Sequence, residues 1–269
     1  MCLSLRNLLL VVFALGFLLG CEKKKTQHLR TETLKVKSLD EVVLVSQKLV
    51  KPVLYTNLSG FEKLSGRKAK AKFISAILPS ILIAKYEIDQ RRKRVLELQG
   101  KKLWDNGDST FYNSMKSRYK AKDANDLLIR IGTLPTSIVL AQAAIESAWG
   151  KSRFFLKANN LFGVWSFSKK DSRIAARYKR KNKTIYLRAY SDMSQSIVHY
   201  FEILSRSRSY RGLRENWQQT VDPFELLPHL QNYSEQRTIY TNRLKKLIVR
   251  NNLTQFDLYK IDPKYLREE

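Results

Sequence analysis

One stretch, residues 134–150, constrains the fold more than any other part of the chain. Pro135 is typical of a helix start and Gly150 of a helix stop. Between them the residues are apolar on nearly every face of the helix that they predict. A helix of this kind belongs in the middle of a hydrophobic core rather than on a surface. The stretch therefore predicts a protein built around one buried helix, and the remaining patterns indicate a mainly α fold.

Two polar side chains interrupt this apolar helix. Gln142 and Glu146 are one helical turn apart, so they share a face. Burial of a carboxylate is costly and raises its pKa, and a carboxyl that stays protonated near neutral pH can act as a general acid. A structural interpretation is equally open from the residues alone: Glu146 could pair with an arginine, or reach water at the helix end.

The charge of the chain favours an anionic partner. Lys and Arg number 50 against 24 Asp and Glu, which gives a formal net charge of +26. The basic residues are spread along the chain, and neither paired Cys/His ligands nor an aromatic RNA-binding strand is present. We therefore expect a diffuse polyanion or an acidic membrane surface and no nucleic acid. The three histidines, His28, His199 and His229, lie beside no acidic pair, so we expect no metal and no cofactor.

The N-terminus predicts export. Arg6 precedes an apolar run, residues 8–19, which has the length of a signal peptide and is short for a bilayer span. The run ends in LLGC at residues 18–21, which resembles the lipobox of bacterial lipoproteins. That resemblance implies that Cys21 becomes the lipidated first residue of the mature chain. Leu19 is bulkier than the residue usual there, so an uncleaved anchor is the alternative.

These features give a predicted domain organisation. Residues 1–20 are a signal peptide, 21–38 a flexible tether, 39–255 the folded domain with an N-terminal helical extension, and 256–269 a tail. The protein is then lipid-anchored in the bacterial cell envelope, on a membrane that the sequence does not identify. Cys2 would leave with the signal peptide, so we expect no disulfide framework.

Helices account for most of the remaining patterns. Residues 66–100 predict a long helix that Pro79 should kink or split. Further helices are predicted through Tyr119 with Asp108 or Ser109 as cap, over 124–131 with Asp123 as cap, after Asp192 or Ser194, and over 223–230 and 235–251. One pattern predicts strands: residues 174–179 and 184–190 flank a polar turn and predict a β-hairpin.

Two central motifs resemble a known family. They are LAQAAIESAWG at residues 140–150 and NNLFG at residues 159–163. Together they resemble the signature of bacterial glucosaminidases acting on peptidoglycan, glycoside hydrolase family 73. The flanking motifs resemble its Bax-like branch: Phe73-Ile74 and residues 78–81 upstream, and Tyr233-Ser234 with Arg237 and Tyr240 downstream.

The resemblance implies a lysozyme-like fold, in which a helical lobe and a small β-hairpin lobe enclose a glycan groove. It implies hydrolysis of β-1,4 bonds of N-acetylglucosamine in peptidoglycan, whose peptides carry carboxylates, with Glu146 as general acid. The remaining site residues implied by the family motifs are substrate-binding: Gln142, Asn159 and Asn160 in the groove floor, Phe162, Trp165, Tyr233 and Tyr240. For Phe162 and Tyr240 a place in the core is the alternative.

The second carboxylate of a glycosidase is hard to find in this chain. Most glycosidases use two carboxylates, whose separation sets the stereochemistry. The predicted hairpin, residues 174–190, contains neither Asp nor Glu. Asp171 precedes it and Asp192 follows it, and Asp192 also suits a helix cap. Either could activate water, or the 2-acetamido group of the substrate could be the nucleophile.

Three other functions stay open. A lytic transglycosylase shares the general fold and uses one acid, but this chain lacks the Gly-Leu-Met-Gln-like segment expected of such enzymes. A catalytically silent lipoprotein that binds glycan would explain the missing carboxylate. A basic membrane-associated or nucleic-acid-binding protein has only the charge in its favour. The bond cleaved and the oligomeric state are open too.

Overall fold

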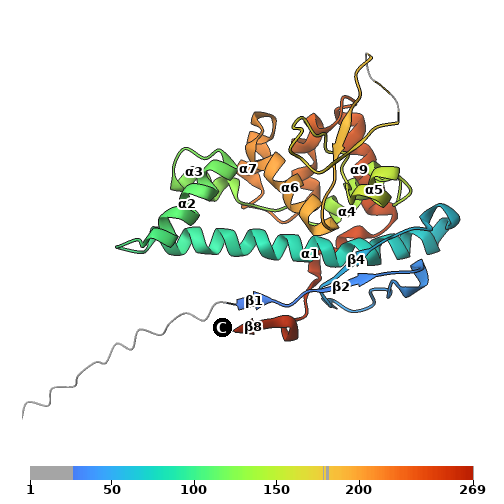
Figure 1. Ribbon diagram of the computed structural model, residues 1–269, viewed down its shortest axis with the longest axis horizontal. Coiled ribbons are helices and arrows are strands. Elements are labelled where there is room, and N and C mark those ends of the chain that lie inside the picture. The colour runs from blue at the N-terminus through green and yellow to red at the C-terminus, as the bar shows by residue number, and fades with distance from the viewer. Residues whose placement is uncertain (1–26, 178, 180–181, 269) are drawn as a thin grey trace, which may run out of the picture.

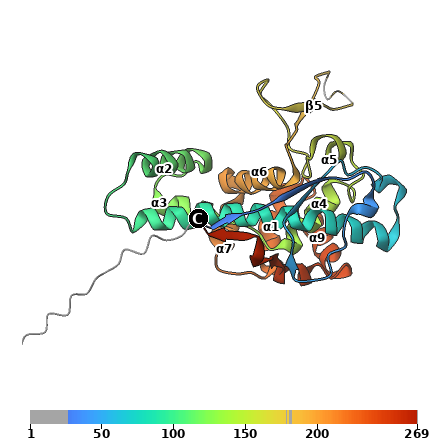
Figure 2. The same cartoon turned by 60° about the horizontal axis from the view of Figure 1, so that its bottom comes forward.

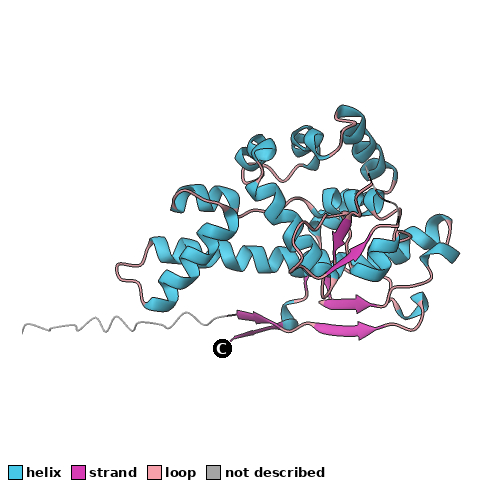
Figure 3. Cartoon of the chain, turned by 45° about the horizontal axis from the view of Figure 1, so that its top comes forward, coloured by secondary structure: helices cyan, strands magenta, loops and turns pink. Residues whose placement is uncertain are grey.

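Helices make up most of the chain, and strands occur as short pairs (Figures 1 and 3). The computed structural model describes residues 27–177, 179 and 182–268. The prediction of a mainly α protein is confirmed. The helices are α1 (Gly66–Gln99), α2 (Asn106–Tyr119), α3 (Ala124–Arg130), α4 (Thr136–Glu146), α5 (Arg153–Ala158), α6 (Met193–Arg206), α7 (Arg211–Asn216), α8 (Pro223–Leu226) and α9 (Thr238–Arg250).

The long helix α1 runs the length of the molecule (Figure 1). Pro79 lies inside it, yet the helix is continuous from Gly66 to Gln99, so a split at Pro79 is wrong and the alternative, a kink, stays a prediction. An interior proline costs about 3 kcal/mol through the lost hydrogen bond and a clash. Pro79 is buried where α1 packs against its neighbours, so burial of the surrounding apolar residues offsets that cost. The hairpin and α5 lie towards one end of α1, and α2 and α3 lie at the other (Figure 2).

Helix α4 is the buried centre that the sequence predicts. Ile138, Val139 and Ala141 are fully buried in the hydrophobic core. The helix begins at Thr136, one residue after Pro135, and its first turn has no capping side chain from its own segment. Asp257 supplies the cap from far along the chain: its carboxylate accepts hydrogen bonds from the Ser137 amide at 2.7 Å and hydroxyl at 2.8 Å.

Local capping signals explain several helix starts. Asp123 caps α3, as predicted, and Asp192 caps α6 by accepting a hydrogen bond from the Gln195 amide at 3.1 Å. For α2 the predicted cap is wrong by three residues. Asp105 is the N-cap, and Asp108 is the third helical residue, whose side chain completes a capping box.

Apart from the hairpin described below, the strands pair segments that lie near the start and the end of the described chain. They are β1 (Gln27–Leu29), β2 (Glu32–Lys35), β3 (Leu49–Val50), β4 (Val53–Thr56), β7 (Lys260–Ile261) and β8 (Leu266–Glu268). Strand β1 pairs antiparallel with β8, while β2 pairs parallel with β4 and β3 pairs parallel with β7. Residues 27–35 are therefore not a free tether, because distant strands satisfy their backbone groups. The predicted C-terminal tail is likewise packed onto the domain.

The predicted signal peptide, Cys21 and the first part of the tether lie outside the described residues. Within the described part of the chain, none of the helices combines the length and the hydropathy that a membrane span requires.

A small β-hairpin stands beside α5, as the lysozyme-like expectation requires (Figure 1). Its strands are β5 (Arg173–Ala175) and β6 (Tyr186–Arg188), shorter than predicted, with Ile174 opposite Leu187. The Arg153 guanidinium of α5 donates a hydrogen bond to the Ala175 carbonyl at 2.8 Å. This contact fixes the hairpin to the helix that follows the end of α4.

Candidate active site

Glu146 is the last residue of α4 and is half-buried. Partial burial raises its pKa above the usual range, although a hydrogen bond from Tyr240 and the nearby charge of Arg243 act in the opposite direction. Its position at the negative end of the helix dipole also disfavours the ionised form. A carboxyl held in this way keeps its proton to higher pH than a free glutamate, which is what a general acid needs.

A chain of hydrogen bonds leads from the core to this carboxyl. The Tyr200 hydroxyl donates to Gln142 Oε1, and Gln142 Nε2 donates to the Tyr240 hydroxyl at 3.1 Å. Tyr240 in turn donates to Glu146 Oε1 at 3.0 Å. The Tyr240 hydroxyl accepts a hydrogen bond from Gln142, so its own proton is free to be donated to Glu146. Gln142 has no exposed surface, and its amide orients Tyr240 from within the core. Its predicted part in substrate binding stays a prediction.

Stacked aromatic rings enclose this hydrogen-bonded chain. Phe162 stacks on Tyr200 with ring centroids 4.2 Å apart, and Tyr233 stacks on Tyr240 at 5.5 Å. Phe162 and Tyr240 are both buried, which agrees with the core alternative for each. Tyr233 is only half-buried, so of these rings it is the one with surface left to meet a ligand.

The two asparagines of the NNLFG motif hold the hairpin to the helical lobe. Asn159 adopts a left-handed conformation with φ 49° and donates from Nδ2 to the Tyr190 carbonyl at 2.9 Å. Asn160 is buried, and its amide donates to the carbonyls of Val164 and Arg188 at 3.0 and 2.9 Å. Both side chains are thus engaged within the protein. Their place in a groove floor stays a prediction.

An exposed aromatic pair lies on the hairpin side. Trp165 forms a β-bridge to Leu187 of β6, and its ring lies 6.1 Å from that of Phe167, which is 87% exposed. Flat apolar ring faces in this position suit the apolar face of a sugar. Sequence reasoning selected Trp165 and missed Phe167. The available signal was their spacing, since extended residues two apart point to the same side.

The two candidate second carboxylates differ in their surroundings. Asp171 accepts hydrogen bonds from the Ser166 hydroxyl at 2.9 Å and the Arg188 guanidinium at 2.7 Å. These contacts, the Ser166 bond foremost, hold the pKa of Asp171 below its usual range, so it stays ionised. Asp192 is engaged as the cap of α6. Asp171 is therefore the better candidate for a base. In the described residues no three His, Cys, Asp or Glu side chains cluster as a metal site.

This combination of a buried helix, a half-buried carboxyl at its end and an adjoining hairpin agrees with a glycoside hydrolase. Residues 121–253 match the profile of the family described as mannosyl-glycoprotein endo-beta-N-acetylglucosaminidase. The chain thus contains a domain of the glucosaminidase family, and the predicted resemblance is confirmed. It is similar to the protein Bax of Escherichia coli K12, with 25% identity over 194 residues that cover 67% of this chain and 69% of Bax.

Solved structures from three bacteria also align with the chain. The catalytic domain of the autolysin Auto from Listeria monocytogenes is 20% identical, with 72% of this chain and 90% of that domain covered and a TM-score of 0.43. A peptidoglycan hydrolase from Sphingomonas sp. A1 is 25% identical, with 52% and 92% covered and a TM-score of 0.38. The glycoside hydrolase domain of Salmonella typhimurium FlgJ is 21% identical, with 52% and 90% covered and a TM-score of 0.37.

Removal of the Tyr240 hydroxyl should shift the pH dependence of catalysis. If protonated Glu146 is the acid, activity falls as the pH rises through its pKa. Tyr240→Phe removes a hydrogen bond that favours the ionised form and so raises the pKa of Glu146, and we expect the alkaline limb of the rate profile to move to higher pH. The check is a series of glycan cleavage rates against pH. As a control, Tyr233→Phe removes a hydroxyl from the stacked ring and should leave the alkaline limb in place. An alkaline limb that does not move in Tyr240→Phe would contradict the effect of Tyr240 on the pKa of Glu146.

His199 should make the fold sensitive to acid. Burial, aided by the charge of Arg188, lowers its pKa from 6.5 to about 4, and its Nδ1 lies 2.7 Å from the Tyr190 hydroxyl. The unfolded chain takes up the proton first, so stability falls as the pH drops from 6.5 towards about 4. Allowing for partial exposure, we expect this loss to be about 2 kcal/mol.

The measurement is urea unfolding of wild type and His199→Gln at both ends of this pH window. Glutamine can still bond Tyr190 but does not titrate, so the stability loss in the variant should be smaller by that amount. An equal loss in the two proteins would show that other groups cause the acid sensitivity.

Proposed function

We propose that this protein hydrolyses β-1,4 glycosidic bonds of N-acetylglucosamine in peptidoglycan. The observation that carries the proposal is the carboxyl of Glu146, held half-buried at the end of α4 by Tyr240 within a glucosaminidase-family domain. Protonated Glu146 donates its proton to the oxygen of the leaving sugar, which makes that sugar a neutral leaving group. The net charge of +26 favours a substrate whose peptides carry carboxylates.

Two routes complete the reaction at the anomeric carbon. In the first, ionised Asp171 accepts a proton from the attacking water. In the second, the 2-acetamido oxygen of the substrate attacks the anomeric carbon, and water then opens the cyclic intermediate. Asp171 is already bound to Ser166 and Arg188, so we favour the second route, in which Glu146 is the essential protein carboxylate.

The test is mass spectrometry of purified peptidoglycan digested by the full chain. We expect fragments whose reducing ends are N-acetylglucosamine. Anhydromuramic ends would instead establish a lytic transglycosylase, and retained binding without any fragment would establish a glycan-binding protein.

We also propose that Cys21 carries the lipid that anchors the protein in the bacterial cell envelope. The lipobox-like residues 18–21 support this proposal. Expression with a radiolabelled fatty acid should label wild type but not Cys21→Ser. Equal labelling of both, or labelling of neither, would refute it.

A further inference from the structure

A cavity of about 400 Å³ adjoins the end of α4, where α4 meets the N-terminal part of α1 and the middle of α9. Ile145, Trp149 and Leu247 give it apolar walls. Residues that precede and follow Glu146 in the sequence, Ile145 and Ala148, both line the cavity. A ligand here would therefore lie against the same helix end that presents the catalytic carboxyl.

The charge of this cavity is of one sign. Lys70, Lys151 and Arg243 line it, and no Asp or Glu does. Lys70 Nζ lies 5.3 Å from the centre of the Trp149 ring and donates to the neutral Asn251 amide oxygen at 2.8 Å. In the part of the chain that the structure describes, no carboxylate forms an ion pair with any of the three cations. Apolar walls lined by three cations that no described ion pair engages fit an anionic group on a partly apolar carrier.

A strained backbone forms the wall of the cavity. Ala148, Trp149 and Gly150 follow one another in the left-handed region, with φ of 51°, 58° and 83°. This conformation is unfavourable for a bulky residue, and such strain is found mainly at functional sites. It turns the chain sharply after Glu146 and holds the Trp149 ring edge-on to Phe73, with centroids 5.5 Å apart. The aromatic wall is thus fixed in place by the core.

Arg243 connects the cavity to the reaction. It lines the cavity, lies one turn beyond Tyr240 on α9, and lowers the pKa of Glu146 by its charge. A larger cavity of about 810 Å³ between β1, α1 and α2 lacks this one-sided character, because Glu87, Glu97 and Asp108 line it beside its cations. The smaller cavity is therefore the one suited to an anion next to the scissile bond.

We propose that this cavity binds a carboxylate-bearing stem peptide of the glycan strand whose sugar occupies the site at Glu146. The inference rests on the proposed function and adds a substrate class to it: the enzyme prefers peptide-substituted glycan to bare glycan. Lys70, Lys151 and Arg243 bind the peptide carboxylate, and Trp149, Ile145 and Leu247 contact its apolar side chains.

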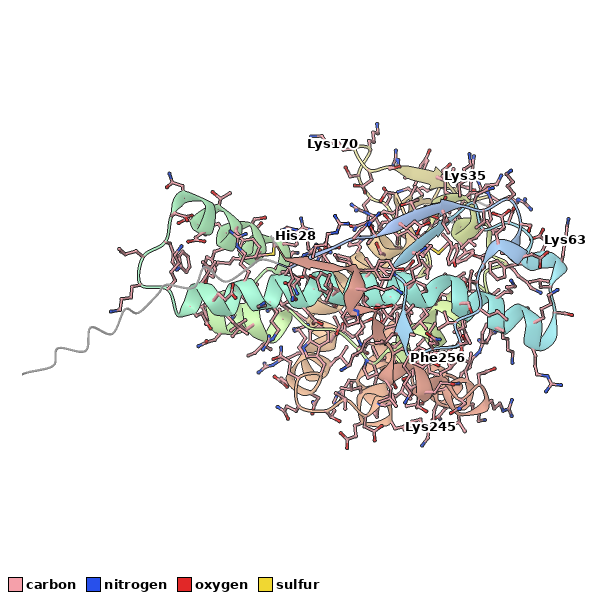
Figure 4. The ribbon with its side chains drawn as sticks, turned by 90° about the horizontal axis from the view of Figure 1, so that it is seen from below. His28, Lys35, Lys63, Lys170, Lys245 and Phe256 are labelled. Atoms are coloured by element: carbon pink, nitrogen blue, oxygen red, sulfur yellow. The ribbon has the colours of Figure 1, made fainter. Side chains whose placement is uncertain are left out.

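The experiment compares the full chain on two soluble substrates, glycan with stem peptides and the same glycan stripped of them. The variant is Lys70→Gln with Lys151→Gln, which leaves Arg243 and Tyr240 untouched. The control is Lys35→Gln with Lys245→Gln, which removes the same charge from two exposed residues outside the cavity (Figure 4). We expect the cavity variant to raise KM for the peptide-bearing glycan about tenfold, with kcat and the bare-glycan KM unchanged.

Three results would overturn the inference. The first is equal cleavage of both substrates by wild type. The second is a cavity variant that still prefers the peptide-bearing glycan. The third is a control variant that loses this preference to the same extent, which would show that diffuse positive charge causes it. Lack of cleavage of either substrate would instead remove the proposed function, and this inference with it. The two failures are therefore distinguishable.

Discussion

Glu146→Gln is expected to lower the rate of glycan cleavage by roughly 10² to 10⁴-fold, because the amide has no acidic proton to give to the leaving sugar. The fold should be retained. A glutamine oxygen can still accept the hydrogen bond that Tyr240 donates, and a neutral side chain is easier to bury than a carboxylate. The measurement is the rate of reducing-end release, with thermal unfolding of the same samples to show that the variant is folded.

Matched variants separate the possible mechanisms. Glu225→Gln neutralises another carboxylate, on α8, and should leave the rate unchanged. Asp171→Asn should cost little if the acetamido group is the nucleophile, and as much as Glu146→Gln if Asp171 is the base. A folded Glu146→Gln protein with full activity would contradict the assignment of the acid and the proposed mechanism together.

Gly150→Ala should destabilise the protein by about 3 kcal/mol, through two independent effects. Gly150 has φ 83°, where an L-residue costs about 1 to 2 kcal/mol. An added Cβ would also lie 3.0 Å from the Phe61 ring and 3.2 Å from Phe73, and overpacking of a core costs about 1 to 3 kcal/mol. Neither ring can move freely, since Phe61 and Phe73 pack edge-on to each other with centroids 6.1 Å apart.

Gly163→Ala provides the control for the second effect. Its φ is 65°, but nothing lies within 4 Å of an added Cβ, so only the conformational cost of about 1 to 2 kcal/mol remains. Urea unfolding of both variants beside wild type gives the comparison. Equal losses in the two would show that Phe61 and Phe73 accommodate the methyl group, and that the packing around Gly150 is loose.

Features encoded by neighbouring residues could be predicted from the sequence. The apolar run of α4 and the caps Asp123 and Asp192 depend on residues within a few positions of one another. The strand pairs of residues 27–35 could not be predicted, because their partners lie near Val53 and Leu266. The same is true of Asp257, which caps α4 from 120 residues away. Secondary structure that needs a distant partner leaves little trace in a local pattern.

The same distinction between local and distant contacts applies to the candidate site. Glu146 could be found because a carboxylate in an apolar helix is conspicuous within one turn. The role of Gln142 could not, since it depends on Tyr200 and Tyr240 from two other helices. The position of Asp171 beside the hairpin could be predicted, but its contacts with Ser166 and Arg188, which keep it ionised, could not.

The Asp257 cap has a consequence for the order in which this protein can mature. A growing chain that has been synthesised through Glu146 still lacks the Asp257 carboxylate that caps α4, and it lacks strand β8, which pairs with β1. The start of α4 acquires its cap only after Asp257 has been synthesised. If Glu146 is the acid, we expect nascent chains and products truncated before Asp257 to cleave glycan more slowly than the full chain, because their α4 lacks its cap.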